Sequence, residues 1–155
     1  MWHNVHVTTS IESAVSTTHQ LAEYLREWLG PRVESDLALA SLAERGLPLT
    51  TVARMTRHGL TRDEVHSLVI HRRTFKHRKS NKQKLSQEES DRAIRTARLL
   101  ARAQATLGDS ATALRWMRQP KTRFEGRTPL QMMVTETGGR LVEEMLLQID
   151  EGMFA

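Results

Sequence analysis

Residues 60–92 read LTRDEVHSLVIHRRTFKHRKSNKQKLSQEESDR, and this stretch decides the fold. It contains two capping boxes: Thr61–Glu64 opens a short helix, and Ser86–Glu89 opens a long one. Between them the pattern predicts a tight turn near residue 70 and a second short helix over residues 71–79, followed by a polar loop. Two short helices joined by a tight turn have the order of a helix-turn-helix, so we expect that motif here.

The second short helix and the loop after it form a cationic strip, defined here as residues 71–84. The strip holds seven Lys and Arg residues and no acidic one. Cations placed on phosphates release condensed counterions, so a strip without acidic partners of its own favours binding to DNA. The alternative is that the run of charge is only a solvated surface. RNA is disfavoured because no aromatic stacking platform accompanies the strip.

Roles can be assigned within the cationic strip. Phe75 is the only large apolar residue of residues 71–79, so the helix is expected to lie on the surface with its charges facing a polyanion. The residues expected to reach base edges are Arg72, Arg73, Lys76 and His77. The residues expected to hold phosphates are Arg78, Lys79 and Lys82.

Toward the N-terminus, apolar spacing predicts three more helices. Residues 17–29 repeat apolar side chains at helical spacing and end at Gly30-Pro31. A second helix ends near residue 46, and a third covers residues 49–58. Residues 1–16 are rich in Ser and Thr, and we expect them to form a flexible arm with a short strand near residues 5–7.

Toward the C-terminus the pattern remains helical. The expected elements are a helix over residues 87–107, a helix capped by Asp109 or Ser110 that stops at Pro120, a loop over residues 121–127, and a helix that Thr128 caps. That last helix is expected to end before Gly138-Gly139, which would form a sharp turn into a final helix over about residues 140–150. Trp28 and Trp116 have the spacing of core residues. The prediction is an all-α fold.

Composition restricts the classes of function. The net charge is +5, and the cations gather in the middle of the chain between more acidic ends, which is typical of a nucleic-acid binder with a second function. The chain has no cysteine, and its seven histidines lack an acidic cluster, so we expect no metal and no cofactor. No catalytic motif is present, so we expect no enzyme. No apolar run approaches the roughly 20 residues of a membrane span, and no signal-peptide pattern occurs, so we expect a cytoplasmic protein.

Three motifs near the C-terminus resemble a known family. ALRWMRQP at residues 113–120, GRTPLQMM at 126–133 and TETGGRLVEEMLLQIDEGMF at 135–154 look like the toxin-binding domain of Xre/MbcA/ParS-type antitoxins, the partners of RES-domain toxins. Residues 60–92 resemble the Xre-like helix-turn-helix of the same family, whose recognition helix carries an Arg-Arg-Thr motif. Thr74 completes that motif and joins the DNA-contacting candidates. Glu125 departs from the family pattern, in which a small residue usually precedes the glycine.

The resemblance implies both a domain organisation and a function. An N-terminal arm and helix would cover residues 1–34, a helix-turn-helix DNA-binding domain residues 35–106, and a toxin-binding domain residues 107–155. Antitoxins of this kind neutralise a RES-domain toxin that degrades NAD⁺ by blocking its active site, and they repress their own promoter. The alternative is a stand-alone transcriptional regulator whose C-terminal domain senses a small molecule.

Recognition of a promoter also bears on oligomeric state. Palindromic operators require a two-fold protein, so we expect at least a homodimer within a larger complex with the toxin. The apolar face of residues 17–29 is either the dimer interface or a cover for the DNA-binding core. The residues of this face are Leu21, Tyr24, Leu25 and Trp28.

The expected toxin contacts lie mainly in the last helix and the tail. They are Arg127, Arg140, Glu143, Glu144, Asp150, Met153 and Phe154. Arg140 is expected at the start of the last helix, where the helix dipole disfavours a cation unless an anion faces it. That anion belongs either to the toxin or to a glutamate of the same chain, and the candidates in the chain are Glu136, Glu143 and Glu144.

Overall fold

The structure is a computed structural model that describes the backbone of residues 5–153 and the side chains of residues 16–153. Over this part every regular element is a helix and no strand occurs, which confirms the all-α prediction. The elements are α1 (Val5–Leu29), α2 (Asp36–Arg45), α3 (Thr50–Arg57), α4 (Arg62–Leu68), α5 (Arg72–Ser80), α6 (Gln87–Leu107), α7 (Ser110–Met117), the 3-10 turn η1 (Thr122–Phe124), α8 (Pro129–Met132) and α9 (Glu136–Asp150).

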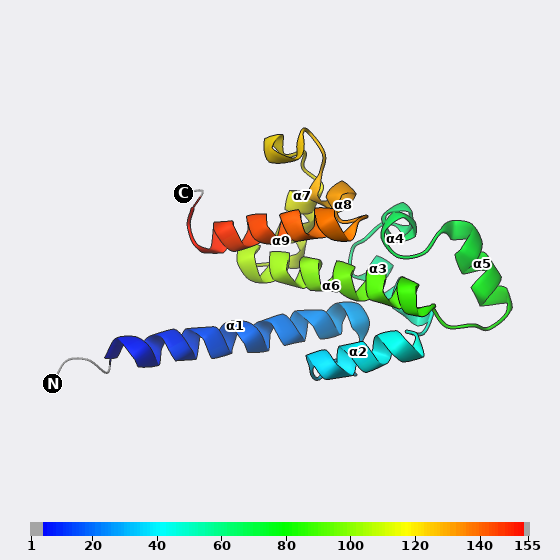
Figure 1. Cartoon of the computed structure of the whole chain (residues 1–155), viewed down its shortest axis with the longest axis horizontal. Coiled ribbons are helices and arrows are strands. Elements are labelled where there is room, and N and C mark those ends of the chain that lie inside the picture. Colours follow the sequence, from blue (N-terminus) through cyan, green and yellow to red (C-terminus); the bar gives the residue numbers. More distant parts are fainter. Residues whose placement is uncertain (1–4, 154–155) are drawn as a thin grey trace.

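Helix α6 lies at the centre of the fold (Figure 1), with α1 and α2 packed on one side and α9 on the other. Its buried alanines Ala93, Ala97 and Ala101 allow these neighbours to approach closely. A buried hydrogen bond from Trp28 Nε1 to Gln104 Oε1, 2.7 Å long, ties α1 to α6. One helix therefore supports both ends of the chain.

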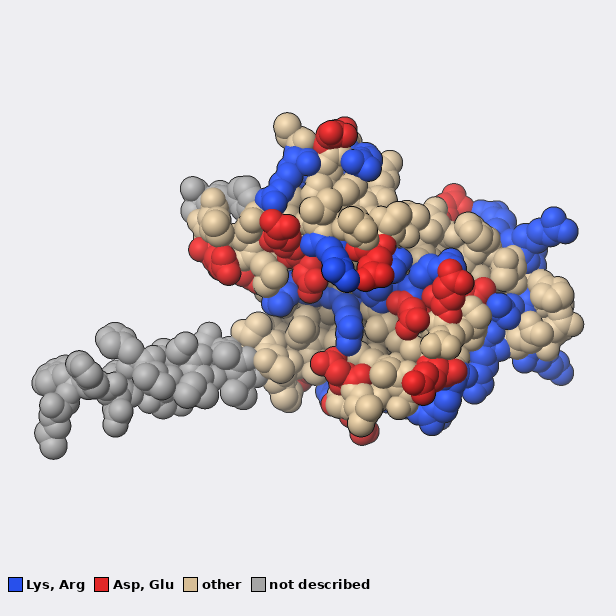
Figure 2. All heavy atoms as spheres, in the orientation of Figure 1, with Lys and Arg blue, Asp and Glu red and all other residues tan. Residues whose placement is uncertain are grey.

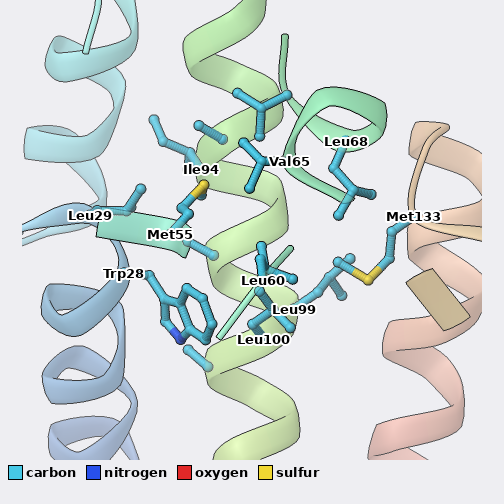
Figure 3. Close-up of a cluster of buried hydrophobic side chains, with 14 of the residues drawn as sticks. Trp28, Leu29, Met55, Leu60, Val65, Leu68, Ile94, Leu99, Leu100 and Met133 are labelled. Carbon is cyan, nitrogen blue, oxygen red and sulfur yellow. The ribbon is translucent and has the colours of Figure 1, made fainter. Parts of the chain in front are cut away.

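The hydrophobic core continues from α1 across α6 to the end of α8 (Figure 3). Trp28 and Met55 lie on one side of α6, and Met133 lies on the other. Leu25 and Trp28 are buried in this core, and Leu21 and Tyr24 pack against it. Of the two roles expected for this face of α1, the structure therefore supports a cover for the core.

The predicted capping boxes are all present. Thr61 Oγ1 accepts a hydrogen bond from the Glu64 N–H (3.1 Å), and Glu64 Oε2 accepts one from the Thr61 N–H (2.8 Å). The same reciprocal bonds open α6 and α8. Asp109 caps α7. These local signals explain why the helices begin where the sequence predicts.

The expected arm and strand at the N-terminus are wrong for residues 5–16, because α1 begins at Val5 and runs unbroken to Leu29. The later part of α1 packs on the core through Leu21, Tyr24, Leu25 and Trp28, and an existing helix gains one hydrogen bond with each further residue. The weak helix preference of Ser, Thr and Val costs only a few tenths of a kcal/mol per residue, which this propagation overcomes. Residues 1–4 lie outside the described part.

The expected turn at Gly138-Gly139 is also wrong, because both glycines lie in the first turn of α9. Thr135 caps this helix, and its Oγ1 accepts from the Gly138 N–H at 3.0 Å. A Cβ on Gly138 would lie 2.0 Å from the Met132 carbonyl oxygen, and one on Gly139 would lie 3.3 Å from a methyl group of Leu99. The glycines permit close packing of α9 on α8 and α6, which a sequence pattern does not reveal.

Candidate functional site

Helix α5 projects from one end of the fold, where α4 and a tight turn hold it (Figure 1). The buried side chains of Val65 and Leu68 anchor α4, and the turn at Val69-Ile70 is buried as well. Helix α5 has no buried residue. Its apolar anchor is the half-buried Phe75, whose ring centroid lies 5.7 Å from that of His66. The predicted order of short helix, turn and exposed basic helix is therefore present.

The predicted base-contacting side chains lie on the outer surface of α5. Arg72, Lys76 and Lys79 follow one another at intervals of four and three residues, which places them on one face. Arg73 and His77 are exposed beside them, whereas Thr74 is half-buried. Arg72 also forms an exposed ion pair with Asp63 of α4.

Arg78 differs from the other cations of the strip because an acidic partner lies inside the fold. Its Nε lies 2.7 Å from Glu89 Oε2, and the side chains are 23% and 9% exposed. Glu89 also completes the capping box of α6 with Ser86. The pair therefore fastens α5 to the first turn of α6, which makes Arg78 a positioning residue for α5.

Lys82 occupies a backbone conformation that favours glycine, with φ at 51°. The N–H of Lys82 donates to the Lys79 carbonyl (3.3 Å), and the N–H of Gln83 donates to the Arg78 carbonyl (2.9 Å). This is the Schellman arrangement that ends many helices. The residues at the equivalent position after α3 and α9 are Gly59 and Gly152. A cation thus stands where glycine would be less strained.

The cations of the described residues divide into two groups. From α6 onward most of them pair with carboxylates, and these pairs are Arg92–Glu88, Arg98–Asp36, Arg102–Asp150, Arg118–Glu64, Arg123–Glu144, Arg127–Glu125 and Arg140–Glu136. Within residues 16–153, the cations with neither an ion pair nor a side-chain hydrogen bond all precede α6. These unpaired cations are Arg32, Arg54, Arg57, Arg62, Arg73, Lys76, Lys79, Lys82 and Lys84. Figure 2 shows Lys and Arg gathered toward the α5 end of the molecule.

The residues predicted to contact a toxin lie on two different faces of α9. Arg140 and Glu143 line a groove between α6 and α9. Glu144 faces η1 instead, where its Oε1 lies 2.9 Å from Arg123 Nη2. Arg140 lies in the second turn of α9 rather than at its start, and it pairs with Glu136 of the same chain at 2.8 Å.

The remaining predicted toxin contacts lie near the loop before α8 and at the end of α9. Arg127 is exposed, and its Nε donates to the Phe124 carbonyl at 3.1 Å. Asp150 lies 3.8 Å from Arg102, and Met153 is 65% exposed. Phe154 lies outside the described residues.

Exposed apolar residues on and beside α9 were missed by the sequence reasoning. Leu141 and Leu147 are each 39% exposed, and Val134, in the turn before α9, is 45% exposed. Leu147 lies four residues after Glu143 and seven after Arg140, so it extends their face with an apolar contact. Apolar side chains left in water beside charged ones are typical of a surface that binds a partner.

Arg118 links the C-terminal helices to the helix-turn-helix. Its Nε and Nη2 lie 2.8 Å and 2.9 Å from the Glu64 carboxylate, and Nη2 also donates to the Gly59 carbonyl at 2.8 Å. Burial raises the pKa of Glu64, but the hydrogen bonds from Arg118 and Thr61 outweigh it and hold that pKa below its ordinary value. The same hydrogen bond raises the pKa of Arg118. The end of α7 is therefore joined to the start of α4.

The described residues contain neither a metal-binding cluster nor a membrane-spanning helix. No group of three or more His, Asp or Glu side chains in that part of the chain is arranged to hold a metal ion. None of the helices described there combines the length and apolar character that crossing a membrane requires.

Two family models match successive parts of the chain. Residues 38–98 match the antitoxin Xre-like helix-turn-helix domain, and residues 102–152 match the antitoxin Xre/MbcA/ParS C-terminal toxin-binding domain. A curated relative, Antitoxin Xre of Pseudomonas putida strain KT2440, is 39% identical over 122 residues, which cover 79% of this chain and 77% of the relative. The chain belongs to the Xre/MbcA/ParS-type antitoxins, with a DNA-binding helix-turn-helix domain followed by a toxin-binding domain.

Proposed function

We propose that this antitoxin neutralises a RES-domain toxin that degrades NAD⁺ by covering its active site, and that it represses its own promoter. The toxin class comes from the family resemblance. The observation that carries the rest is the separation of surfaces: unpaired cations gather before α6, while α9 combines paired charges with exposed leucines. Such a chain is suited to a polyanion at one end and a protein at the other, and its role is binding rather than catalysis.

The proposed DNA contacts follow from exposure and pairing. Arg72, Arg73, Lys76 and His77 reach base edges, with Thr74 on the flank of the helix. Lys79 and Lys82 hold phosphates. Arg78 is assigned to positioning, because releasing it from a nearly buried carboxylate would cost more than a surface contact returns.

The proposed toxin surface centres on Arg140 and Glu143 and extends to Leu147. The pair of Arg140 with Glu136 leaves Arg140 available, because an exposed pair four residues apart contributes only about 0.3–0.5 kcal/mol. The further proposed contacts are Arg127, Glu144, Asp150, Met153 and Phe154.

The proposal also sets the organisation of the molecule. We take residues 1–34 as the N-terminal segment, residues 35–106 as the DNA-binding domain and residues 107–155 as the toxin-binding domain, in a cytoplasmic homodimer. Because the described face of α1 already covers the core, a dimer must use another surface. Light scattering of the purified protein, alone and with a palindromic operator, tests whether it is a dimer. A monomer that occupies the operator as a single copy would contradict the proposed dimer.

Co-expression with a RES-domain toxin from a neighbouring reading frame tests the function. We expect the chain to restore growth and to co-purify with the toxin. Arg140→Ala combined with removal of residues 151–155 should release the toxin while promoter binding persists. Lys76→Ala is the matched control, because it should lose promoter binding and still restore growth.

Growth restored fully by the first variant would contradict the proposed surface. DNA binding that depends on a small molecule, without rescue, would favour a stand-alone regulator.

A further inference from the structure

We propose that a pocket between α1, α2 and α3 holds a phosphate of the DNA backbone, outside the contacts made by α5. This inference rests on the proposed promoter binding and extends it. The cavity measures about 400 Å³ and has an apolar floor that includes Leu29, Leu42 and Leu47. Its described lining contains four cations and no acidic residue. The cations are Arg32, Arg45, Arg54 and Lys84.

A close backbone contact builds the rim of this pocket. Gly46, with φ at 77°, approaches Leu85 so tightly that a Cβ would lie 2.4 Å from the Leu85 carbonyl oxygen. The Leu85 N–H donates to the Leu47 carbonyl (2.9 Å), and the Leu47 N–H donates to Ser90 Oγ (2.9 Å). The loop that carries Lys84 is thereby held against the end of α2, beside Arg45.

The charges of the pocket lack anions of their own. Arg32, Arg54 and Lys84 are unpaired among residues 16–153, and the described contact of Arg45 is a hydrogen bond from its Nε to the Ser41 carbonyl (3.2 Å). Arg54 is half-buried, with its guanidinium packed against Gly30. Withdrawing a guanidinium from water without an acidic partner is unfavourable, so this grouping indicates that an anion completes it.

Continuity with the cationic strip identifies the anion as DNA. Lys84 is both the last cation of the strip and part of the pocket rim, so a single DNA strand can contact α5 and the pocket in succession. Figure 2 shows the Lys and Arg side chains continuing from the α5 end along the edge of the molecule toward α2. The N–H groups of Thr51 and Val52 at the start of α3 already donate to the Pro48 and Leu49 carbonyls, so the side-chain cations are the groups that would hold the anion. Arginine binds phosphate oxygens through paired N–H donors.

The test compares four variants that each remove one positive charge. Arg54→Gln and Lys84→Gln alter the pocket, Lys76→Gln alters α5, and Arg115→Gln is a control on α7, whose guanidinium bonds only Thr112 among the described residues. Affinity for a promoter duplex is measured across a salt series, with a thermal melt for each variant. Lys84 is exposed, so its variant remains informative if Arg54→Gln fails to fold.

We expect each pocket variant to weaken binding about tenfold and to reduce the salt slope by about one, while Arg115→Gln changes neither. In a methylphosphonate scan, each phosphate of the duplex is neutralised in turn. Neutralising one phosphate, distinct from those that depend on Lys76, should weaken binding of the parent protein but have no further effect on binding of the Arg54 variant. If Lys76→Gln weakens DNA binding and neither pocket variant does, this inference fails and the proposed function stands. If no variant weakens binding, the proposed function fails. Saturable binding of AMP that depends on Arg54, with DNA affinity unchanged, would assign the pocket to a free nucleotide and overturn the inference.

Discussion

Arg78 and Lys82 lie four residues apart in the cationic strip, yet the fold uses their charges differently. Arg78 is held by Glu89 against the first turn of α6, so its charge is already compensated. Lys82 has no such partner within residues 16–153 and is kept in a left-handed conformation that costs a non-glycine residue about 1–2 kcal/mol. A strained conformation at a cation that has no partner among residues 16–153 supports the proposed phosphate contact of Lys82.

Lys82→Gly should therefore stabilise the protein while weakening DNA binding. Removing the strain outweighs the extra chain entropy of glycine, so we expect the free energy of unfolding in urea to rise by about 0.5–1 kcal/mol. Promoter affinity should fall about tenfold with the loss of one phosphate contact. Lys79→Gln is the control, since it removes a charge without changing the backbone. A Lys82→Gly protein that is less stable than the parent would contradict the role assigned to the strain.

Helix ends were predictable where the signal lies within a few residues of the end. The boxes at Thr61, Ser86 and Thr128 each involve side chains three residues apart, so the sequence predicted α4, α6 and α8 at their observed starts. The start of α9 was missed because Gly138 is required by a carbonyl oxygen of α8, a contact between elements that local patterns do not encode. The cationic strip lies within fourteen consecutive residues, so it was predictable. The pairing of Arg78 with Glu89 and the pocket around Arg54 depend on contacts between separate elements, so they were not.

The two glycines of α9 should respond differently to alanine. Gly138→Ala places a methyl group 2.0 Å from a backbone oxygen, so we expect a loss of roughly 3 kcal/mol in unfolding free energy and release of the toxin. In Gly139→Ala the nearest atoms to the new methyl are movable side-chain carbons of Leu99 at 3.3 Å and Arg95 at 3.7 Å, and helix propensity improves, so the stability should stay within about 1 kcal/mol of the parent. Urea unfolding of both variants checks this, and equal effects would contradict the assigned packing of α9 on α8.

The bridge between α4 and α7 should make stability depend on acid. The pKa of Glu64 is lowered in the folded state, so its stabilising effect is complete above the ordinary glutamate pKa and is lost as pH falls through the folded value. Glu64→Gln keeps a capping side chain but removes the charge. We expect the variant to be less stable at neutral pH and the difference to vanish in acid. Urea unfolding at a series of pH values measures it, and a difference that persists at the lowest pH would contradict the bridge.

Across the whole molecule, the separation of unpaired from paired cations gives the two proposed activities different physical origins. Most of the proposed contacts to DNA depend on charges that have no anionic partner among residues 16–153, the exception being Arg72, which pairs with Asp63. The proposed contacts through α9 depend on exposed leucines and on charges such as Arg140 and Glu144 that are already paired within the chain. The net charge of +5 alone did not reveal this, because pairing depends on which residues the fold brings together.

Salt should therefore separate the two activities. With six or more phosphate contacts, promoter affinity should fall about a thousandfold between roughly 50 and 200 mM salt. Affinity for the toxin should change far less over the same range, because apolar burial is not screened. Anisotropy with a labelled duplex and interferometry with the immobilised toxin measure the two affinities on one preparation. A parallel loss of both affinities would contradict the separation.

The central position of α6 has a consequence for how such proteins are recombined. Its faces are covered by α1 and α2 on one side and by α9 on the other, and Leu99 packs against the backbone at Gly139. Both matched domains therefore pack on α6, and neither can be exchanged independently of that helix. A chimaera that joins this helix-turn-helix domain to the toxin-binding domain of another antitoxin must also take the face of α6 that packs on α9 from that antitoxin. Otherwise the side chains at the interface between the two domains will not fit together.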